Sequence, residues 1–336
     1  MIWLNNSRIV AMFAVVFLHS AGLVVLYSPI GTENWWLGNI YDSFARWCVP
    51  VFVMISGALL LDTTKMEDLK SFYIKRLSKI MIPIMFWTVF FLLWVVLKKS
   101  LKGEIIEAGD LTNRLLSGAP YFHLWFLYMI FFLYLFTPFF RKIISNSSRF
   151  EILVLILFTF IISALNAFVA KFELSQSSLF INWFLTYIPY FFLGYFIRTG
   201  QIHFKKPILW IVFSLSVFST AMGCYFVTKN QGLDAGLYFY HYLSITVIPM
   251  SIAIFCLLKN WTKPIYNVQL TNKISSLTLG IYLIHPIFLE IIQYTGYGPL
   301  SYNSMISIPI ASVVVFCLSL GIVWVINAIP YMKRII

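Results

Sequence analysis

The chain has 336 residues, of which 60% are hydrophobic and 11% are charged, and its mean hydropathy is +0.86. A soluble domain with so little polar surface would aggregate, so the composition excludes one and indicates a membrane protein. The net charge of +12 does not indicate a nucleic-acid partner, because the 24 Lys and Arg residues are scattered through short loops instead of forming one basic stripe.

Ten apolar stretches approach the roughly 20 residues needed to cross a hydrocarbon core about 30 Å thick. The predicted spans are 8–27, 45–61, 80–97, 122–140, 150–170, 180–198, 207–227, 236–258, 276–293 and 305–329. No small-residue cleavage site follows the first, so we expect it to be retained as a span. We therefore predict an all-α integral membrane protein of about ten transmembrane helices. Residues 1–336 are expected to form a single transmembrane domain, without a soluble domain.

Lys and Arg divide unevenly between the two sides of this arrangement. Seventeen fall on the side that holds both termini and seven on the other. Because cytoplasmic loops are enriched in Lys and Arg, both termini are predicted to be cytoplasmic. The 62–79 and 259–275 loops should then face the cytoplasm and the 28–44 loop the outside. Four of the seven outer cations lie in the 98–121 loop, together with three acidic residues, which makes this loop the weak point of the orientation.

The first span carries two ionisable side chains, Arg8 at its cytoplasmic start and His19 near the bilayer midplane. Eleven residues at 100° each bring them to within about 20° of one face and about 16 Å apart along the axis. Such a face can lead an anionic ligand from the arginine to the imidazole. The alternative is that Arg8 snorkels to the interface and His19 bonds a neighbouring helix. Spacing alone favours neither interpretation.

A compact basic cluster precedes the third span. Arg76 and Lys79 stand one turn apart and Lys75 lies beside them. Together they can bind the phosphates of a nucleotide-bearing cofactor. Positive charge is also ordinary at this interface, where it contacts anionic lipid headgroups, so both interpretations stay open.

On the predicted outer side, Arg46 opens the second span with Asp42 four residues earlier, and Tyr121, His123 and Trp125 gather at the start of the fourth. Aromatic rings beside an arginine suit a sugar site. The simpler explanations are a local ion pair and the aromatic belt that interfaces usually carry.

The ninth span contains His285 and Glu290, which lie about 140° apart around a helix axis and are not expected to touch. Pro286 directly follows His285, so the backbone carbonyl one turn earlier is left without its helical donor and the helix bends. Kinks of this kind commonly line a cavity inside a membrane protein. His285 is therefore a candidate polar group of such a cavity.

Other chemistry is not indicated. The four cysteines each lie in an apolar run without the close spacing that metal or redox sites require, so they are interpreted as packing residues and no metal site is predicted. No nucleophile elbow, Walker loop or zinc-protease motif occurs. Histidine is the general base that the candidate cavity offers.

Five motifs in order resemble the acyltransferase-3 family of membrane O-acyltransferases, and the resemblance covers nearly the whole chain. They are Arg8-x10-His19; Arg46-x3-Pro50-x-Phe52-x-Met54-Ile55-Ser56-Gly57; Arg76-x2-Lys79; His123-Leu124-Trp125-Phe126; and Gly280-Ile281-Tyr282-Leu283-Ile284-His285. Within the family, the likeness is to stand-alone bacterial members that acetylate O-antigen or enterobacterial common antigen, and the segment from Trp3 to Arg8 resembles the latter type.

The resemblance implies an enzyme that moves an acetyl group from cytoplasmic acetyl-CoA to a sugar hydroxyl of a cell-surface polysaccharide or its lipid-linked precursor. It implies a location in the bacterial inner membrane with the acceptor at the periplasmic side. His19 would be the catalytic histidine with Arg8 as its motif partner, and Arg76 would contact CoA. Many members have a second arginine where this chain has Lys79, which keeps the charge but loses the bidentate fork.

A transporter or flippase of a lipid-linked glycan is the competing class. It explains polar groups at mid-membrane and aromatics outside, but not a CoA-like basic site on the inner side. A structural scaffold in polysaccharide assembly is a third interpretation, and it predicts that cavity substitutions have no effect. The acyl transfer itself has two routes, in which His19 either activates the sugar hydroxyl directly or is acetylated first.

Overall fold

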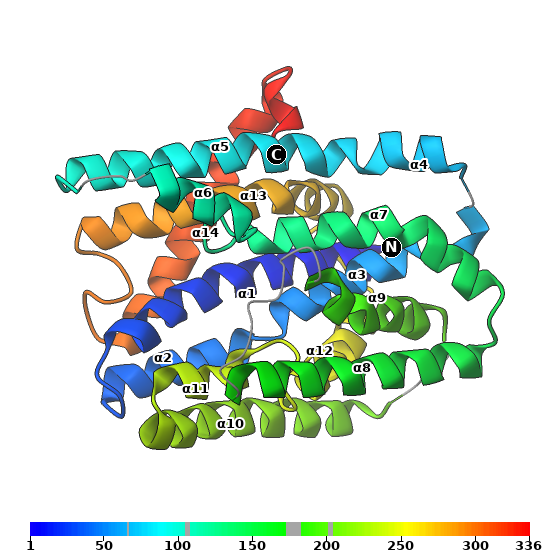
Figure 1. Cartoon of the computed structure of the whole chain (residues 1–336), viewed down its shortest axis with the longest axis horizontal. Helices are drawn as coiled ribbons and strands as arrows, with labels where there is room; N and C mark the ends of the chain where they lie inside the picture. The colour runs from blue at the N-terminus through cyan, green and yellow to red at the C-terminus, as the bar shows by residue number, and fades with distance from the viewer. Residues whose placement is uncertain (66, 105–107, 173–182, 201–203) are drawn as a thin grey trace.

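The computed structural model describes residues 1–65, 67–104, 108–172, 183–200 and 204–336, and these residues form helices joined by short segments (Figure 1). The α-helices are α1 (Ile2–Tyr27), α2 (Glu33–Ala45), α3 (Cys48–Leu60), α4 (Leu69–Arg76), α5 (Ser78–Leu101), α6 (Ala108–Leu116), α7 (Trp125–Ser145), α8 (Arg149–Phe172), α9 (Trp183–Thr199), α10 (Lys206–Gln231), α11 (Leu233–Gly236), α12 (Val247–Lys259), α13 (Val268–Tyr294) and α14 (Ser304–Ala328). Short 3₁₀ turns are η1 (Thr63–Lys65), η3 (Leu237–Tyr240) and η4 (Met332–Arg334).

Among the described residues, eight helical stretches are long and apolar enough to cross a membrane. Two of them join consecutive helices: α2 and α3 form Glu33–Leu60, and α4 and α5 form Leu69–Leu101. The shorter α12 is apolar as well. Large apolar side chains are exposed along the outside of α5, α8, α10 and α14, as expected for surfaces that face lipid. The chain is thus an all-α membrane protein, as predicted from its sequence.

Helix α1 lies in the interior of the bundle, between α13 and α7 on one side and α2 and α3 on the other (Figure 1). It packs against α2, α3, α12, α13 and α14, and much of its surface is buried. Its start and its end define the two ends of the bundle, which are called the Arg8 end and the Tyr27 end. Helix α1 is therefore the element that connects the two ends through the core.

Close helix packing depends on Gly57 of α3 and Gly194 of α9. A Cβ atom on Gly57 would lie 1.8 Å from the carbonyl oxygen of Phe191, and one on Gly194 would lie 1.9 Å from that of Met54. The reciprocal contact brings the two backbones together, which is how small residues support helix association in lipid. Helix α3 and helix α9 are therefore tightly packed against each other.

That loop prediction is wrong over most of its length, because Glu33 to Ala45 form helix α2. Thr32 caps the helix by accepting a hydrogen bond from the Trp35 backbone N–H at 3.4 Å. The polar residues that suggested a loop are buried and bonded: the Asn39 amide donates to the Ala221 carbonyl oxygen at 2.9 Å, and the Tyr240 hydroxyl donates to Asn39 Oδ1 at 2.6 Å. Helix α2 is therefore a polar helix inside the bundle.

The predicted span 236–258 is also shorter than expected. Its first part consists of η3 and turns, and the helix α12 begins only at Val247. The turn segment places Tyr240, His241 and Tyr242 beside the Tyr27 end of the core, where they line a cavity.

Candidate functional site

One face of α1 touches two cavities at opposite ends of the bundle. Arg8 and Val15 line the first cavity, and Gly22 and Leu26 line the second. All four lie within about 40° of one line along the helix, and so does His19, which stands between the two pairs. The face that Arg8 and His19 share thus runs along α1 from one cavity to the other, and His19 itself is not among the described lining residues of either cavity.

The first cavity, called the basic cavity, has a volume of about 310 Å³. Its mouth carries Arg8, Arg76 and Lys79, and no carboxylate is among its described lining residues. The walls combine hydroxyl groups with apolar side chains from α1, α3, α5, α7 and α13: Ser56, Tyr134, Ser275, Ser276, Thr278 and Tyr282 with Val15, Val49, Phe52, Ile55, Ile80, Phe126, Leu127, Ile130 and Leu279. A cationic mouth above a narrow apolar and hydroxyl-bearing interior suits a phosphate-bearing molecule with a long arm.

Arg8 is oriented by a polar cluster that the neighbouring sequence supplies. Its Nη1 donates to Asn5 Oδ1 at 3.5 Å, and the Ser275 hydroxyl donates to the same oxygen at 3.0 Å. The Asn5 amide donates in turn to Asn272 Oδ1 at 2.7 Å. These bonds tie the start of α1 to α13, so that the guanidinium is held at the cavity mouth.

The other two cations come from the break between α4 and α5. Arg76 ends α4 and Lys79 lies in the first turn of α5, and both side chains line the basic cavity. Lys75 does not line this cavity; it forms an exposed salt bridge with Glu67 at 3.3 Å. Of the predicted phosphate-binding cluster, the structure thus brings Arg76 and Lys79 together with Arg8 and leaves Lys75 apart.

His19 is bonded to the other candidate histidine of the membrane interior. Its Nδ1 lies 2.7 Å from Nε2 of His285, and the two rings are nearly parallel, with 4° between their planes. Nδ1 of His285 lies 2.7 Å from the carbonyl oxygen of Tyr282. That carbonyl lacks its helical donor because residue 286 is a proline, which has no N–H. Pro286 therefore leaves the Tyr282 carbonyl oxygen free to accept a hydrogen bond from His285.

The tautomers of both histidines follow from this chain of contacts. A carbonyl oxygen only accepts, so Nδ1 of His285 carries a hydrogen and donates to Tyr282. In a neutral imidazole the remaining nitrogen accepts, so Nδ1 of His19 donates to Nε2 of His285. Nε2 of His19 is left with a free lone pair. The His19 ring becomes positively charged when Nε2 is protonated or forms a covalent bond. The same two hydrogen bonds stabilise that charge.

The segment before α7 covers this pair of histidines. The Phe122 ring meets His19 edge-on at 5.1 Å between ring centres, and His123 meets His285 at 5.6 Å. His123 is 1% exposed and is absent from the lining of both cavities, although the sequence placed it with the outer substrate group. The Tyr282 hydroxyl donates to the His123 carbonyl oxygen, which ties this segment to α13.

Glu290 holds the same segment from the Tyr27 end. Its carboxylate accepts hydrogen bonds from Trp94 Nε1 at 2.9 Å, from Lys98 Nζ at 2.7 Å and from the Tyr121 hydroxyl. Glu290 is thus paired with α5 and with the segment before α7, and it does not contact His285, as its helical spacing predicted.

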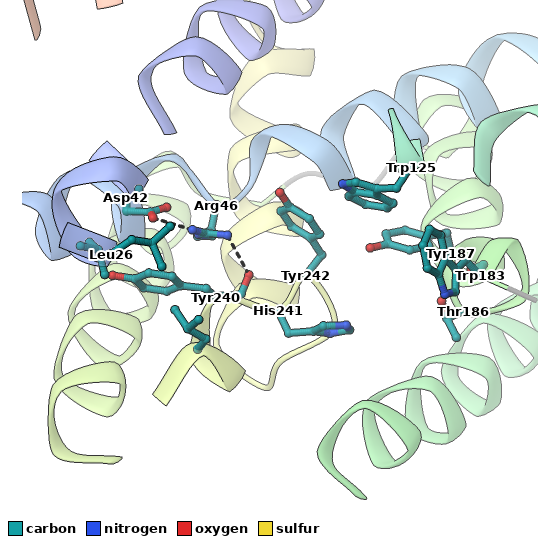
Figure 2. Close-up of a pocket in the computed structure, with 13 residues that line it drawn as sticks. Leu26, Asp42, Arg46, Trp125, Trp183, Thr186, Tyr187, Tyr240, His241 and Tyr242 are labelled. Carbon is teal, nitrogen blue, oxygen red and sulfur yellow. Dashed lines mark hydrogen bonds and ion pairs between the residues drawn. The ribbon is translucent and has the colours of Figure 1, made fainter. Parts of the chain in front are cut away.

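The second cavity, called the aromatic cavity, has a volume of about 560 Å³, and Val25 and Leu26 near the Tyr27 end are among its lining residues. One wall is polar, with Asp42, Arg46 and Tyr240, and the opposite wall carries Trp125, Trp183, Thr186 and Tyr187 (Figure 2). Tyr242 lies between the walls, and His241 and Leu26 complete the rim. Arg46 and Trp125, both predicted substrate residues, are therefore brought into one cavity.

Arg46 is paired inside this cavity as its spacing suggested. Its Nη2 donates to Asp42 Oδ2 at 2.5 Å and its Nη1 to the Tyr240 carbonyl oxygen at 3.3 Å, while the guanidinium lies over the Tyr240 ring at 4.1 Å. The Asp42 side chain is 1% exposed and that of Arg46 14%. The pair is buried, so its attraction is little weakened by solvent.

Sequence reasoning missed Trp183, Tyr187 and Tyr242 as cavity residues. Aromatic residues are frequent at membrane interfaces, so their presence alone carried no signal. They come from α9 and from the turns before α12, which lie far from Arg46 in sequence. Only the packing of these elements shows that their rings share a cavity with Arg46.

The fold and the site together define an integral membrane protein of α-helices in which a half-buried histidine stands on α1 between the residues that line a basic cavity and those that line an aromatic one. A family model described as an acyltransferase domain, that of the acyltransferase-3 family, matches residues 1–328. The chain belongs to this family and is a membrane acyltransferase. No curated protein and no solved structure matches it significantly.

Proposed function

We propose that the chain moves an acetyl group from acetyl-CoA in the basic cavity to a sugar hydroxyl in the aromatic cavity, with His19 as the group that activates the transfer. The acceptor would be a cell-surface polysaccharide or its lipid-linked precursor. The observation that carries the proposal is the position of His19 on one face of α1 between the two cavities, with Nε2 free to react.

The basic cavity fits the donor. Arg8, Arg76 and Lys79 match the phosphates of CoA, and the hydroxyl-bearing apolar interior matches its extended amide arm. The thioester at the end of that arm would lie near His19. No metal is required for this chemistry, since the charge that develops on the imidazole is held by His285.

The proposed orientation puts the basic cavity at the cytoplasmic side and the aromatic cavity at the periplasmic side of a bacterial inner membrane. The excess of Lys and Arg at the Arg8 end supports it. Two of the cations in the opposing 98–121 loop are paired, Lys98 with Glu290 at 2.7 Å and Lys99 with Asp110 at 2.6 Å. Two cations at the Arg8 end are paired as well, Lys75 with Glu67 and Arg198 with Asp62, so the support for this orientation is the number of Lys and Arg residues and not their pairing.

In the direct route, Nε2 of His19 takes the proton of the acceptor hydroxyl while the hydroxyl oxygen bonds to the thioester carbonyl carbon. The carbon–sulfur bond then breaks, and the CoA sulfur leaves with the proton that His19 returns. An ester and free CoA are the products. In the two-step route Nε2 bonds to the thioester carbonyl carbon and the sulfur leaves as CoA thiolate. The hydroxyl oxygen then takes the acetyl group as its bond to Nε2 breaks, and the hydroxyl proton goes to the thiolate.

A test of the proposal uses purified protein, radiolabelled acetyl-CoA and a glycan extract as acceptor. His19→Gln keeps polarity and approximate size but provides no basic or nucleophilic ring nitrogen. We expect it to fold and bind acetyl-CoA, with transfer reduced by about 10²–10⁴-fold, the usual contribution of a positioned proton-transfer group. Substantial transfer by the folded variant would contradict the role of His19.

The same assay separates the remaining alternatives. Label that stays on the wild-type protein after a rapid quench, and that is absent from His19→Gln, indicates the acetylated imidazole. A transporter of lipid-linked glycan would instead move its substrate without consuming acetyl-CoA, and a scaffold would tolerate the substitution.

A further inference from the structure

We propose that the aromatic cavity selects an electrically neutral sugar ring, with a hydroxyl group against the exposed part of Arg46. The inference rests on the proposed function and goes beyond it, because it decides between a neutral ring and an anionic ring or phosphate as the group bound beside Arg46. Three features of the cavity carry it: its charge, the exposed part of Arg46 and its aromatic wall.

The charge of Arg46 is already neutralised. Asp42 pairs with it at 2.5 Å, and the two side chains are nearly enclosed. An anion placed beside this pair would meet the Asp42 carboxylate as well as the guanidinium, and it would lose its water without gaining a net opposite charge. Besides Arg46, His241 is the basic residue among the described lining residues, and it lies at the rim (Figure 2). The cavity thus offers no net attraction for a phosphate or a uronate.

Only part of the pair faces the cavity. Nε of Arg46 and Oδ1 of Asp42 have no hydrogen-bond partner within the protein, but both atoms are buried, so a ligand in the cavity does not reach them. The Arg46 side chain as a whole is 14% exposed, against 1% for Asp42. A guanidinium carries five N–H donors, and a neutral hydroxyl oxygen accepts from such a donor without bringing a charge into the cavity.

The opposite wall supplies flat apolar surface. Trp125 and Tyr242 lie at 5.8 Å between ring centres with 24° between their planes, and Tyr187 lies 5.9 Å from Trp125. The C–H face of a pyranose ring packs well on such aromatic surfaces while its hydroxyls point to the polar wall. A lipid chain would match the aromatic wall but not the wall that carries Asp42 and Arg46, so the two walls together favour a sugar.

The pair also lies close to the reacting group along α1. Gly22 is one turn beyond His19, and a Cβ atom on Gly22 would be 3.5 Å from Asp42 Oδ2. The glycine therefore lets the carboxylate approach α1 at the level where an activated hydroxyl is needed.

The test measures CoA release from acetyl-CoA by purified protein, with water as the acceptor and then with added methyl glycosides. Neutral probes are the methyl glycosides of glucose, galactose, rhamnose and N-acetylglucosamine, and the anionic probe is methyl glucuronoside. We expect at least one neutral glycoside to accelerate CoA release and to be acetylated, and methyl glucuronoside to do neither. Acceleration by methyl glucuronoside alone would overturn the inference. Absence of any His19-dependent CoA release would instead count against the proposed function.

Variants of the two walls sharpen the result. Asp42→Asn leaves Arg46 uncompensated, so methyl glucuronoside should gain a response, of about tenfold or more for one charge-assisted hydrogen bond. Trp125→Leu tests the aromatic wall without touching the ion pair, and it should raise the neutral glycoside concentration needed for half-maximal response. Trp36→Leu is the matched control, because Trp36 lies at the same end but stacks on Tyr225 at 4.5 Å, outside the cavity. Equal effects of Trp125→Leu and Trp36→Leu, in folded protein, would contradict a sugar platform.

Discussion

At the scale of single residues, the direction of the hydrogen bonds from His19 to His285 and on to the Tyr282 carbonyl determines which nitrogen of His19 reacts. Pro286 removes the backbone N–H that would otherwise occupy that carbonyl. His285 is a positioning residue in this arrangement, because it acts through His19 and not on the substrate. A side chain with the same donor and acceptor pattern should therefore replace it.

We expect His285→Leu to lower kcat about 10²-fold, since it leaves Nδ1 of His19 without an acceptor. His285→Gln carries both an acceptor for His19 and a donor for Tyr282, so its kcat should stay within about tenfold of the wild type. The KM for acetyl-CoA should change little in either variant. Steady-state kinetics of folded protein are the measurement, and equal losses in both variants would show that His285 is only a packing residue.

The local half of this arrangement could be predicted from the sequence, and the long-range half could not. Helical periodicity placed Arg8 and His19 on one face, and Pro286 indicated a freed carbonyl. The contact between His19 and His285 depends on the register of α1 against α13, which are separated by more than 200 residues in the sequence. The alignment of α1 against α13 cannot be deduced from a single sequence, so His285 was predicted only as a polar residue of a cavity.

At the scale of secondary-structure elements, the break between α4 and α5 turns Arg76 and Lys79 toward the basic cavity while Lys75 pairs with Glu67. Arg76→Ala should therefore raise the KM for acetyl-CoA about 10–100-fold and leave kcat and stability nearly unchanged. Lys75→Ala removes an adjacent exposed cation and is the control. If the two variants raise KM equally, Arg76 contributes only general positive charge at the interface.

Helices α3 and α9 provide a second prediction at this scale. Gly57→Ala would force a methyl group against the Phe191 carbonyl, so we expect a loss of about 1–3 kcal/mol in the free energy of unfolding. Gly321→Ala on α14 is the matched control, because a Cβ atom there meets nothing within 4 Å. Unfolding of both variants in detergent micelles, followed by circular dichroism, is the measurement. Equal stability of the two variants would contradict close packing at Gly57.

Element boundaries show where sequence reasoning was weakest. Helix α2 was predicted as a loop because it contains Glu33, Asn39 and Asp42, and polar residues normally indicate exposure to water. In the folded chain Asn39 is bonded to α10 and to Tyr240, and Asp42 is paired with Arg46. Partners on other elements allow these polar groups to be buried, and a single sequence does not reveal them.

At the scale of the whole molecule, the two cavities open at opposite ends of a bundle whose central helix passes His19 between them. In the proposed mechanism, this arrangement would keep donor and acceptor on different sides of the membrane while only the acetyl group crosses. The orientation of the protein must be known before such transfer can be measured. Cys48, Cys224 and Cys256 are buried, so Cys317→Ser combined with Thr64→Cys gives one accessible thiol at the Arg8 end. We expect an impermeant thiol reagent to label this site from the cytoplasmic side of inverted membrane vesicles.

The central claim is tested most directly in sealed proteoliposomes whose orientation has been fixed by that label. Radiolabelled acetyl-CoA is supplied only on the side of the Arg8 end, and a sugar acceptor is enclosed only on the side of the Tyr27 end. We predict that acetylated sugar accumulates on the acceptor side in wild-type vesicles, and that His19→Gln vesicles of equal protein content form none. Acetylated sugar that appears only when donor and acceptor share one side, or equal formation by His19→Gln, would contradict transfer through the bundle.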